Sequence, residues 1–323
     1  MDMDIPQPVL QMHLSASPAE RTPPTLRTTR AEQPAEFIFS DQLSATHDPQ
    51  LRAMWLRWNP APRPNFNPAL LEDLSRYCHF LAQADGSQRE GLIECDAGSL
   101  PFGYTVLASR VKGVFNLGGD LDLFARLVAS QDGEGLLRYG HACIKVLHQN
   151  YMSHGLPITT ISLIQGECLG GGFEAALSSD VLVAEKSARF GFPEILFNLF
   201  PGMGAYSFLE RKIGYRETER LIASGKIYSA DDMLDLGVVD VVAPDGGGEA
   251  AVASYIGARR HSRSGLAGLA AARRAVHNLE YEELSRVVKA WAETALRLSA
   301  RDLKLMQRLV SRQNNMHASR NLH

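Results

Sequence analysis

The sequence lacks the marks of a membrane or secreted protein. No stretch of it approaches the roughly 18 apolar residues that a membrane-spanning helix needs. Residues 1–24 carry acidic residues and prolines where a secretory signal has basic and then apolar residues. We therefore expect a cytoplasmic protein without a membrane span.

Cysteine is scarce, and the chain has no excess of basic charge. The 4 cysteines, Cys78, Cys95, Cys143 and Cys168, form no CxxC pair and fit no zinc-binding spacing. We expect reduced, mostly buried thiols and no bound metal. Lysine and arginine number 33 against 36 acidic residues, which gives a net charge of −3. No basic field therefore favours a nucleic-acid partner.

What is present is typical of a soluble globular enzyme. Hydrophobic residues make up 45% and charged residues 21% of the 323 residues, enough for a substantial core. We expect a flexible, Pro- and Ser-rich arm over residues 1–35, because such composition favours disorder. An α/β core over 36–248 and a helical region over 249–323 follow; the latter would cover the active site or contact other subunits.

Strand-like and helix-like segments alternate through the expected core, which favours an α/β domain with crossover connections. Asn67 and Pro68 are typical of a helix start, with Asn67 as the N-cap. Short apolar runs predict strands at residues 53–58, 91–95, 105–108, 158–164, 180–184 and 238–242. Apolar spacing predicts helices at residues 69–82, 121–154 (interrupted near Gly133 and Gly135), 173–178, 249–260, 267–278, 281–297 and 300–312.

A glycine loop carries the main functional signal. The stretch QGECLGGGFE, residues 165–174, leads from a buried strand through three glycines into a helix. Glycine lets the backbone approach a ligand closely, and unpaired N–H groups at a helix start can stabilise an oxyanion. Glu174 lies in the first turn of this helix. The helix dipole alone also favours an acid there, so the loop by itself allows a purely structural interpretation.

A second acidic residue lies among large apolar ones. In FGFPEILF, residues 190–197, burial would raise the pKa of the Glu194 carboxyl and prepare it to carry a proton. A surface glutamate on a buried loop is the alternative. Two carboxyls in different environments suit acid–base chemistry at adjacent carbon atoms.

A third segment places glycines before a helix. In FNLGGDL, residues 115–121, a backbone N–H could complete an oxyanion hole with the first glycine loop. The alternative is a simple turn capped by Asp120.

These segments together resemble the crotonase (enoyl-CoA hydratase/isomerase) superfamily over residues 50–310, most specifically over 158–214. In that family one glutamate follows the GGG loop and a second lies in a PE motif twenty residues later, as Glu174 and Glu194 do here. The resemblance implies a crotonase-like spiral of ββα units with oxyanion-hole amides at Gly119 and Gly171. Many members have alanine where this sequence has Gly119, and glycine retains the N–H.

Longer strings resemble the bacterial diffusible signal factor synthases within that superfamily, namely PRPNFNP, FNLGGDLDLF, GGGFEAALSSDV and PEILFNLFPGMGAYS. Those enzymes dehydrate a 3-hydroxyacyl chain on acyl carrier protein to a cis-2-enoyl chain and hydrolyse the thioester. The product is a cis-2-unsaturated fatty acid used in quorum sensing. The resemblance implies that Gly119 and Gly171 hold the thioester oxygen, that Glu174 and Glu194 move protons, and that no metal or redox cofactor is needed.

Two other functions remain open. An ordinary enoyl-CoA hydratase of fatty-acid metabolism would keep both glutamates and differ in its carrier, coenzyme A, and in releasing no free acid. A non-catalytic scaffold or regulatory subunit on the same fold is the non-enzyme alternative.

The substrate pocket and the partners are expected as follows. Residues near the glutamates in sequence are candidates for binding the acyl tail, although each is explained equally well as core: Leu117, Phe192, Leu196, Phe197 and Met203. The resemblance also implies a homotrimer or hexamer. A cognate signal-sensor protein is a hypothetical partner of the helical tail or the N-terminal arm.

Overall fold

The computed structural model describes residues 22–27, 34–87 and 90–308. Most of the expected N-terminal arm lies outside these ranges. Its residues Thr25–Arg27 form strand β1, which pairs antiparallel with β2 (Glu36–Ser40). This part of the arm is therefore an edge strand and not the flexible segment that its composition predicts.

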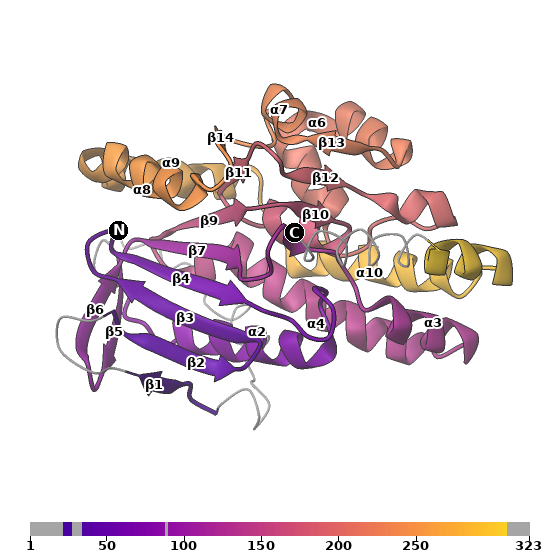
Figure 1. The fold of residues 1–323 in the computed structure, drawn as a ribbon, viewed down its shortest axis with the longest axis horizontal. Helices are drawn as coiled ribbons and strands as arrows, with labels where there is room; N and C mark the ends of the chain where they lie inside the picture. The colour runs from indigo at the N-terminus through magenta and orange to yellow at the C-terminus, as the bar shows by residue number, and fades with distance from the viewer. Residues whose placement is uncertain (1–21, 28–33, 88–89, 309–323) are drawn as a thin grey trace, which may run out of the picture.

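An eight-stranded sheet forms the main layer of the molecule, in the order β1-β2-β3-β4-β7-β9-β11-β14 (Figure 1). Strands β1 to β4 are antiparallel neighbours, and the strands from β4 to β14 run parallel. The remaining members are β3 (Leu43–Asp48), β4 (Ala53–Trp58), β7 (Tyr104–Ser109), β9 (Thr159–Ile164), β11 (Val181–Glu185) and β14 (Val241–Ala243). The central parallel strands are almost wholly buried, which explains their continuous apolar sequences.

A smaller four-stranded sheet has the order β13-β12-β10-β8. Its strands are β8 (Val114–Asn116), β10 (Glu167–Leu169), β12 (Arg189–Gly191) and β13 (Ile227–Ser229). The chain passes from β7 to β8, from β9 to β10 and from β11 to β12, so three successive turns each place one strand in each sheet. Helices follow each pair, which confirms the expected spiral of ββα units.

The helices begin where local chemistry satisfies their free N–H groups. Asn67 accepts a hydrogen bond from the Leu70 N–H and caps α2 (Pro68–Leu81), as expected. Asp132 accepts one from Gly135 and starts α4, so the long helical region divides near the expected glycines. The helices of the core are α3 (Leu121–Ala129), α4 (Gly133–Tyr151), α5 (Gly171–Leu177), α6 (Ala205–Ser224) and α7 (Ala230–Asp235), with the short turns η1 (Ser153–Gly155) and η2 (Pro193–Phe197).

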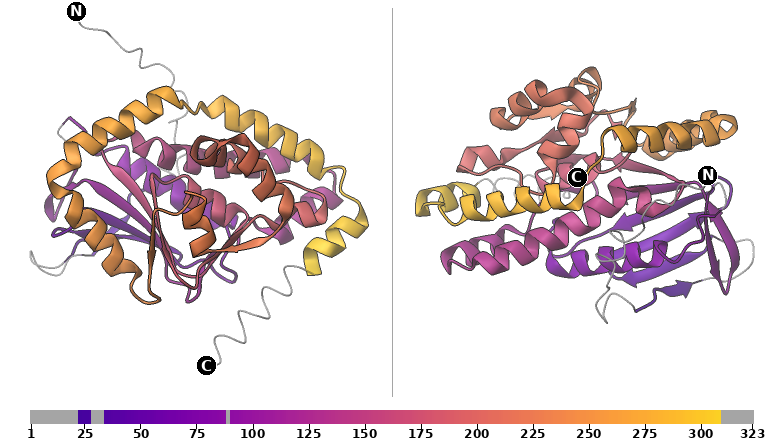
Figure 2. Two further views of the ribbon diagram at one scale, coloured as in Figure 1. Left: turned by 90° about the horizontal axis from the view of Figure 1, so that it is seen from above. Right: turned by 180° about the vertical axis from the view of Figure 1, so that it is seen from behind.

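After β14 the described chain is helical, as expected. It forms α8 (Gly248–Arg259), η3 (Arg260–Ser262), α9 (Arg263–Val276), α10 (Tyr281–Ala295) and a further helix over residues 300–308. Helix α10 packs along α4, while α8 and α9 lie at the other side of the molecule, as Figure 2 shows from above. Within the described ranges, every helix is too short or too polar to cross a lipid bilayer.

One predicted strand is shorter than expected, and another pairs outside the main sheet although its bounds are as predicted. The strand expected at residues 238–242 begins only at Val241, because the N–H groups of Val238 and Val239 both bond to the Met233 carbonyl and close helix α7. Strands β5 (Gly91–Cys95) and β6 (Gly98–Phe102) form a separate hairpin beside the main sheet.

Candidate active site

The small sheet brings three loops to one place. Strands β8, β10 and β12 are parallel neighbours, so their carboxyl ends meet at one edge, where α/β folds commonly bind ligands. The Gly118–Gly119 loop follows β8, the Gly170–Gly171 loop follows β10, and Glu194 follows β12. Residues up to about 80 positions apart in the sequence therefore meet because of the spiral topology alone.

The two glycine loops touch each other and allow no side chain between them. Gly118 has a φ of +100°, and a Cβ there would lie 2.9 Å from the Gly171 amide nitrogen. Gly170 has a φ of +51°, which L-residues with side chains rarely adopt. The Asn116 side chain fixes the first loop by accepting a hydrogen bond from the Gly118 N–H at 2.8 Å.

The amides of Gly119 and Gly171 are placed to bind an oxygen atom together. A Cβ on Gly171 would lie 3.5 Å from the Gly119 nitrogen, so the two backbones are neighbours. Gly171 is the first residue of α5, where the N–H has no acceptor within the helix. Both glycines line the same pocket, and among the described residues neither N–H has a hydrogen-bond acceptor. This arrangement suits an oxyanion hole.

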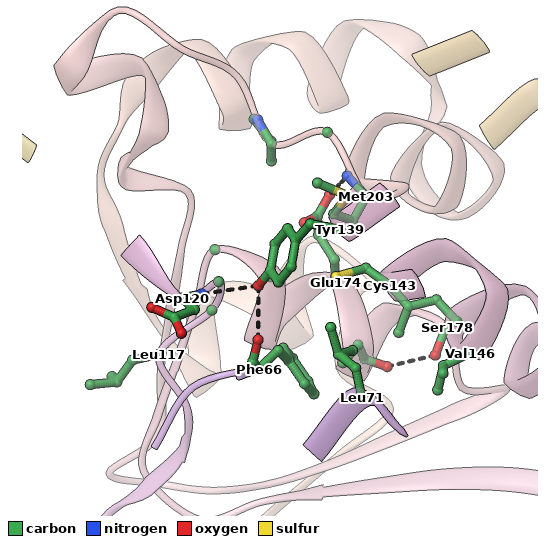
Figure 3. A pocket seen from close by; sticks show the side chains of 18 of the residues that line it. Phe66, Leu71, Leu117, Asp120, Tyr139, Cys143, Val146, Glu174, Ser178 and Met203 are labelled. Carbon is green, nitrogen blue, oxygen red and sulfur yellow. Dashed lines mark hydrogen bonds between the residues drawn. The ribbon is translucent and has the colours of Figure 1, made fainter. Parts of the chain in front are cut away.

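A tyrosine that the sequence did not single out holds the first of these loops. The Tyr139 hydroxyl, from α4, accepts a hydrogen bond from the Asp120 N–H and donates one to the Phe66 carbonyl oxygen, each at 2.9 Å (Figure 3). The Phe66 N–H in turn donates to Gly118 O at 2.8 Å. The PRPNFNP string thus braces the loop, and Asp120 caps α3 at the same time.

Glu174 is buried, and its carboxylate is held by two backbone amides. It is 2% exposed, and its Oε1 accepts hydrogen bonds from the N–H groups of Met203 at 2.7 Å and Ala205 at 3.0 Å. Burial raises the pKa of Glu174 to about 7, against the smaller lowering effect of the two amides. The carboxyl can therefore take up or release a proton near neutral pH.

Glu194 lies against the second glycine loop. A Cβ on Gly170 would be 2.6 Å from Glu194 Oε1, so the carboxyl packs on the bare backbone. Its Oε2 is buried and has no hydrogen-bond partner among the described residues. Burial, and then the negative charge of Glu174, raise the pKa of Glu194 to about 8. The charge of Glu174 thus acts on Glu194, and the two carboxyls are expected to titrate as an interacting pair.

A largely apolar pocket opens onto both glutamates and both amides. Of the candidate tail-binding residues, Leu117, Phe197 and Met203 line it. Phe192 and Leu196 do not: Phe192 is buried and stacks on Phe173 with ring centroids 4.8 Å apart, and Leu196 is 45% exposed. The lining also includes residues that the sequence did not single out, such as Trp58, Leu71, Leu74, Tyr139, Cys143, Val146, Leu147, Ala175 and Trp291.

The buried cysteines are poorly suited to covalent catalysis. None forms a disulfide, and Cys78, Cys143 and Cys168 are buried, as expected. Cys143 lines the pocket, but burial raises the pKa of its thiol to about 12, which removes the reactive thiolate. Within the described part of the chain, no three His, Cys, Asp or Glu residues cluster as metal ligands.

Part of the chain is similar in sequence to a known bacterial protein. It is 38% identical over 141 residues to the fatty acid oxidation complex subunit alpha of Pseudomonas savastanoi pv. phaseolicola, which covers 43% of this chain. The match spans only 19% of that relative, about a fifth of its length.

Solved structures with low sequence identity share the fold. An enoyl-CoA hydratase from Bacillus halodurans superposes with a TM-score of 0.67 at 21% identity, covering 83% of this chain and 99% of that one. Human mitochondrial delta3-delta2-enoyl-CoA isomerase gives 0.64 at 20%, covering 85% and 99%. DspI of Pseudomonas aeruginosa gives 0.60 at 19%, covering 76% and 91%.

The family assignment rests on more than half of the chain. The family model described as enoyl-CoA hydratase/isomerase matches residues 100–290, which contain both glycine loops and both glutamates. The chain therefore belongs to the enoyl-CoA hydratase/isomerase family, also called the crotonase superfamily.

Proposed function

We propose that the protein makes a cis-2-unsaturated fatty acid signal from a 3-hydroxyacyl thioester on acyl carrier protein. It would first eliminate water to give the cis-2-enoyl thioester and then hydrolyse the thioester to release the free acid. The observation that carries this proposal is the meeting of two carboxyls of raised pKa, Glu174 and Glu194, beside two free amides. The four strings that resemble those of the signal synthases support the finer assignment.

The dehydration step follows from this geometry. The amides of Gly119 and Gly171 hold the thioester oxygen, where negative charge develops as the α-proton leaves. One carboxylate of the pair removes that proton, and the protonated carboxyl donates its own to the departing 3-hydroxyl, which leaves as water. After this step the proton is on the residue that acted as the base, and it must pass to the other carboxylate before the next cycle.

The same groups suit hydrolysis. A carboxylate of the pair activates water, which attacks the thioester carbonyl carbon, and the Gly119 and Gly171 amides stabilise the tetrahedral intermediate. Protonation of the departing sulfur by the neutral carboxyl releases the carrier thiol and the free acid. The pocket that leads away from Glu174 is lined mainly by apolar side chains, which suits a fatty acyl tail.

A second candidate is an ordinary enoyl-CoA hydratase of fatty-acid metabolism. The identity to the fatty acid oxidation complex subunit of a Pseudomonas species favours it specifically. Such an enzyme would use the same glutamates to add water to a 2-enoyl-CoA and would not release a free acid.

The test is to incubate the protein with 3-hydroxydodecanoyl acyl carrier protein and identify the lipid products by mass spectrometry. Free cis-2-dodecenoic acid from the wild type, and far less from Glu174→Gln and Glu194→Gln, would support the signal-synthase proposal. Fast hydration of crotonyl-CoA without any free acid would replace it with the hydratase. Turnover of neither substrate would favour a non-catalytic role.

A further inference from the structure

Most of the pocket lining is apolar, but one part of it, the polar end, is formed by Tyr77, Asn150 and His154. Its lining runs along α4 past Cys143, Val146 and Leu147. It then reaches Asn150 near the end of that helix and His154 in the following turn. Tyr77, from α2, lines the same region and lies against His154, with ring centroids 5.9 Å apart.

These side chains carry hydrogen-bonding atoms that the described protein does not use. Tyr77 is 1% exposed and Asn150 is 4% exposed. The Tyr77 hydroxyl, Asn150 Oδ1 and both ring nitrogens of His154 are buried without a partner among the described residues. One unpaired buried polar group costs about 1–3 kcal/mol. Several of them facing one pocket therefore point to a ligand that pairs with them.

The orientation of the Asn150 amide is fixed by its neighbours. Its Nδ2 donates to the hydroxyl oxygens of Ser178 at 2.9 Å and Ser179 at 3.1 Å. This leaves Oδ1 as the acceptor that remains. Ser178 lines the pocket one helical turn beyond Glu174 on α5, so this group borders the space that a bound acyl chain would fill (Figure 3).

The turn that carries His154 is held in an unusual conformation. Ser153 and His154 have φ values of +51° and +55°, which are uncommon for residues with side chains. The Ser153 hydroxyl accepts a hydrogen bond from Arg274 at 3.0 Å and lies 3.4 Å from Asp180 Oδ2. Such strain persists where surrounding contacts impose it, and here it places the imidazole beside Tyr77.

The polar end is uncharged at neutral pH. Burial lowers the pKa of His154 to about 4, so the imidazole is neutral and offers one donor and one acceptor. Burial also raises the pKa of Tyr77 well above its usual value, so the phenol keeps its proton. A carboxylate would find no positive partner among these three side chains, and burying an unpaired charge is costly.

Helix α4 runs from the Gly118–Gly119 loop to the polar end of the pocket, so its length gives the distance between them. Tyr139 contacts that loop, and the rise from Tyr139 to Asn150 along the helix is about 16 Å. A fatty acyl chain that starts at the Gly119 and Gly171 amides would therefore present a carbon distant from the thioester to this region.

We propose that Tyr77, Asn150 and His154 bind an uncharged oxygen-bearing group, a hydroxyl or a carbonyl, toward the far end of the acyl chain. The preferred substrate is then an acyl thioester with an oxygenated tail. This specificity rests on the proposed function of the glutamate site. A plain alkyl end would leave the same polar atoms unpaired, which is the physical basis of the discrimination.

The test compares two substrates of equal length, 3-hydroxydodecanoyl acyl carrier protein and the same chain with an added ω-hydroxyl. We expect kcat/KM to be higher for the ω-hydroxylated chain, and Tyr77→Phe to reduce this ratio about 3- to 10-fold, the value of one hydrogen bond. Tyr77→Phe removes only a hydroxyl that has no partner in the described protein. Tyr151→Phe, on α4 but outside the pocket lining, is the matched control and should leave the ratio unchanged.

Binding measured by calorimetry separates this proposal from the proposed reaction. The probes are ω-hydroxydodecanoic acid and dodecanoic acid, and neither needs turnover. Tighter binding of the hydroxylated acid, weakened by Tyr77→Phe, supports tail recognition even if the dehydration fails. Turnover of both thioesters with equal kcat/KM, together with equal or tighter binding of dodecanoic acid, would overturn tail recognition and leave the proposed reaction standing.

Discussion

The hydroxyl oxygen of Tyr139 lies 2.9 Å from the amide nitrogen of Asp120, the residue directly after Gly119. The same hydroxyl donates to Phe66 O, so helix α4 is tied to both segments that shape the first oxyanion loop. In the proposed reaction Tyr139 would therefore act through the position of the Gly119 amide. It contacts the loop rather than the reacting atoms.

Tyr139→Phe should lower kcat with little change in KM. Both hydrogen bonds disappear, the Gly119 amide moves, and a displacement of about 1 Å in such a group can reduce the rate about 100-fold. The pH dependence should stay the same because both carboxyls are untouched. Steady-state kinetics on the acyl carrier protein substrate measure this, and an unchanged kcat would show that the tyrosine has a purely structural role.

The glutamate pair should be indispensable to the reaction. Glu174→Gln and Glu194→Gln should each lower kcat about 100- to 10,000-fold, since each removes a group that transfers a proton. In the first variant the side-chain oxygen can still accept from Met203 and Ala205, so the fold should persist. Glu210→Gln, on the exposed part of α6, is the matched control. Full activity in either pocket variant would contradict the assigned roles.

The activity should depend on pH as a coupled pair of carboxyls requires. One carboxyl must be ionised and the other protonated, and their pKa values are raised to about 7 and about 8. Activity should rise as pH increases through the lower value and fall as it increases through the upper one, with the optimum between them. A profile of kcat/KM that stays flat from mildly acidic to mildly alkaline pH would count against this pairing.

The same raised pKa values make stability depend on pH. The folded protein holds these protons more tightly than the unfolded chain, where a glutamate has a pKa of 4.5. The resulting stabilisation is complete below that value and is lost as the pH rises through the folded pKa values. One pKa unit corresponds to about 1.4 kcal/mol, so the rise of the Glu194 pKa from 4.5 to about 8 sets an upper limit of about 5 kcal/mol. Glu194→Gln should therefore raise the free energy of unfolding in alkaline buffer by up to that amount and leave it unchanged in acid.

Denaturant titrations in buffers on either side of these pKa values measure the effect on stability. Glu210→Gln, whose carboxyl is exposed, should match the wild type in both buffers. The contrary result is that the free energy of unfolding falls by the same amount in Glu194→Gln and in the wild type on going to alkaline buffer. Glu194 would then ionise freely in the folded protein.

The sequence predicts those parts of the site whose residues lie close together in the chain. Glu174 and Gly171 lie in one strand–loop–helix unit, so their spacing is encoded in consecutive residues. Tyr139 gives no such signal, because it is a helical residue 19 positions from Asp120 and meets it only when α4 packs against the loop. A tyrosine among the apolar positions of a helix looks like core.

Closeness to the glutamates in the sequence also does not predict which side chains point into the pocket. Leu196 and Phe197 are adjacent, but they lie in η2, where successive side chains point about 120° apart. Phe197 therefore faces the pocket while Leu196 faces outward. Phe192 packs on Phe173 instead of entering the pocket.

Helix α6 was not predicted because its sequence has no continuous apolar stripe. Only a few of its residues are buried, and two of these are polar: Ala205, Ser207, Phe208, Leu209, Thr218 and Leu221. It is also broken in conformation at Gly214, where φ is +76°. The N-terminal end of α6 matters for the site, because Ala205 and Met203 in the preceding turn donate their N–H groups to Glu174. Tertiary contacts rather than periodicity define this element.

Substitution by alanine should reduce activity at Gly118 but not at the neighbouring Gly119. At Gly118 a Cβ would lie 2.9 Å from Gly171 N and 3.1 Å from Leu169 O, on a backbone with φ of +100°. At Gly119 the nearest atom is the Tyr139 hydroxyl at 3.2 Å, and the amide N–H is kept. Gly118→Ala should separate the two loops and reduce kcat about 100-fold, whereas Gly119→Ala should stay within about threefold of the wild type.

The backbone strain of the Gly118 variant can be separated from the loop contact. Gly98 has a similar φ of +97° but nothing within 4 Å of a Cβ, so Gly98→Ala carries the strain without any contact. It should lose stability by about 1 kcal/mol and keep its kcat, because non-glycine residues at such angles are costly wherever they lie. If Gly118→Ala lost only stability and kept its kcat, the close approach of the two glycine loops would not be required for catalysis.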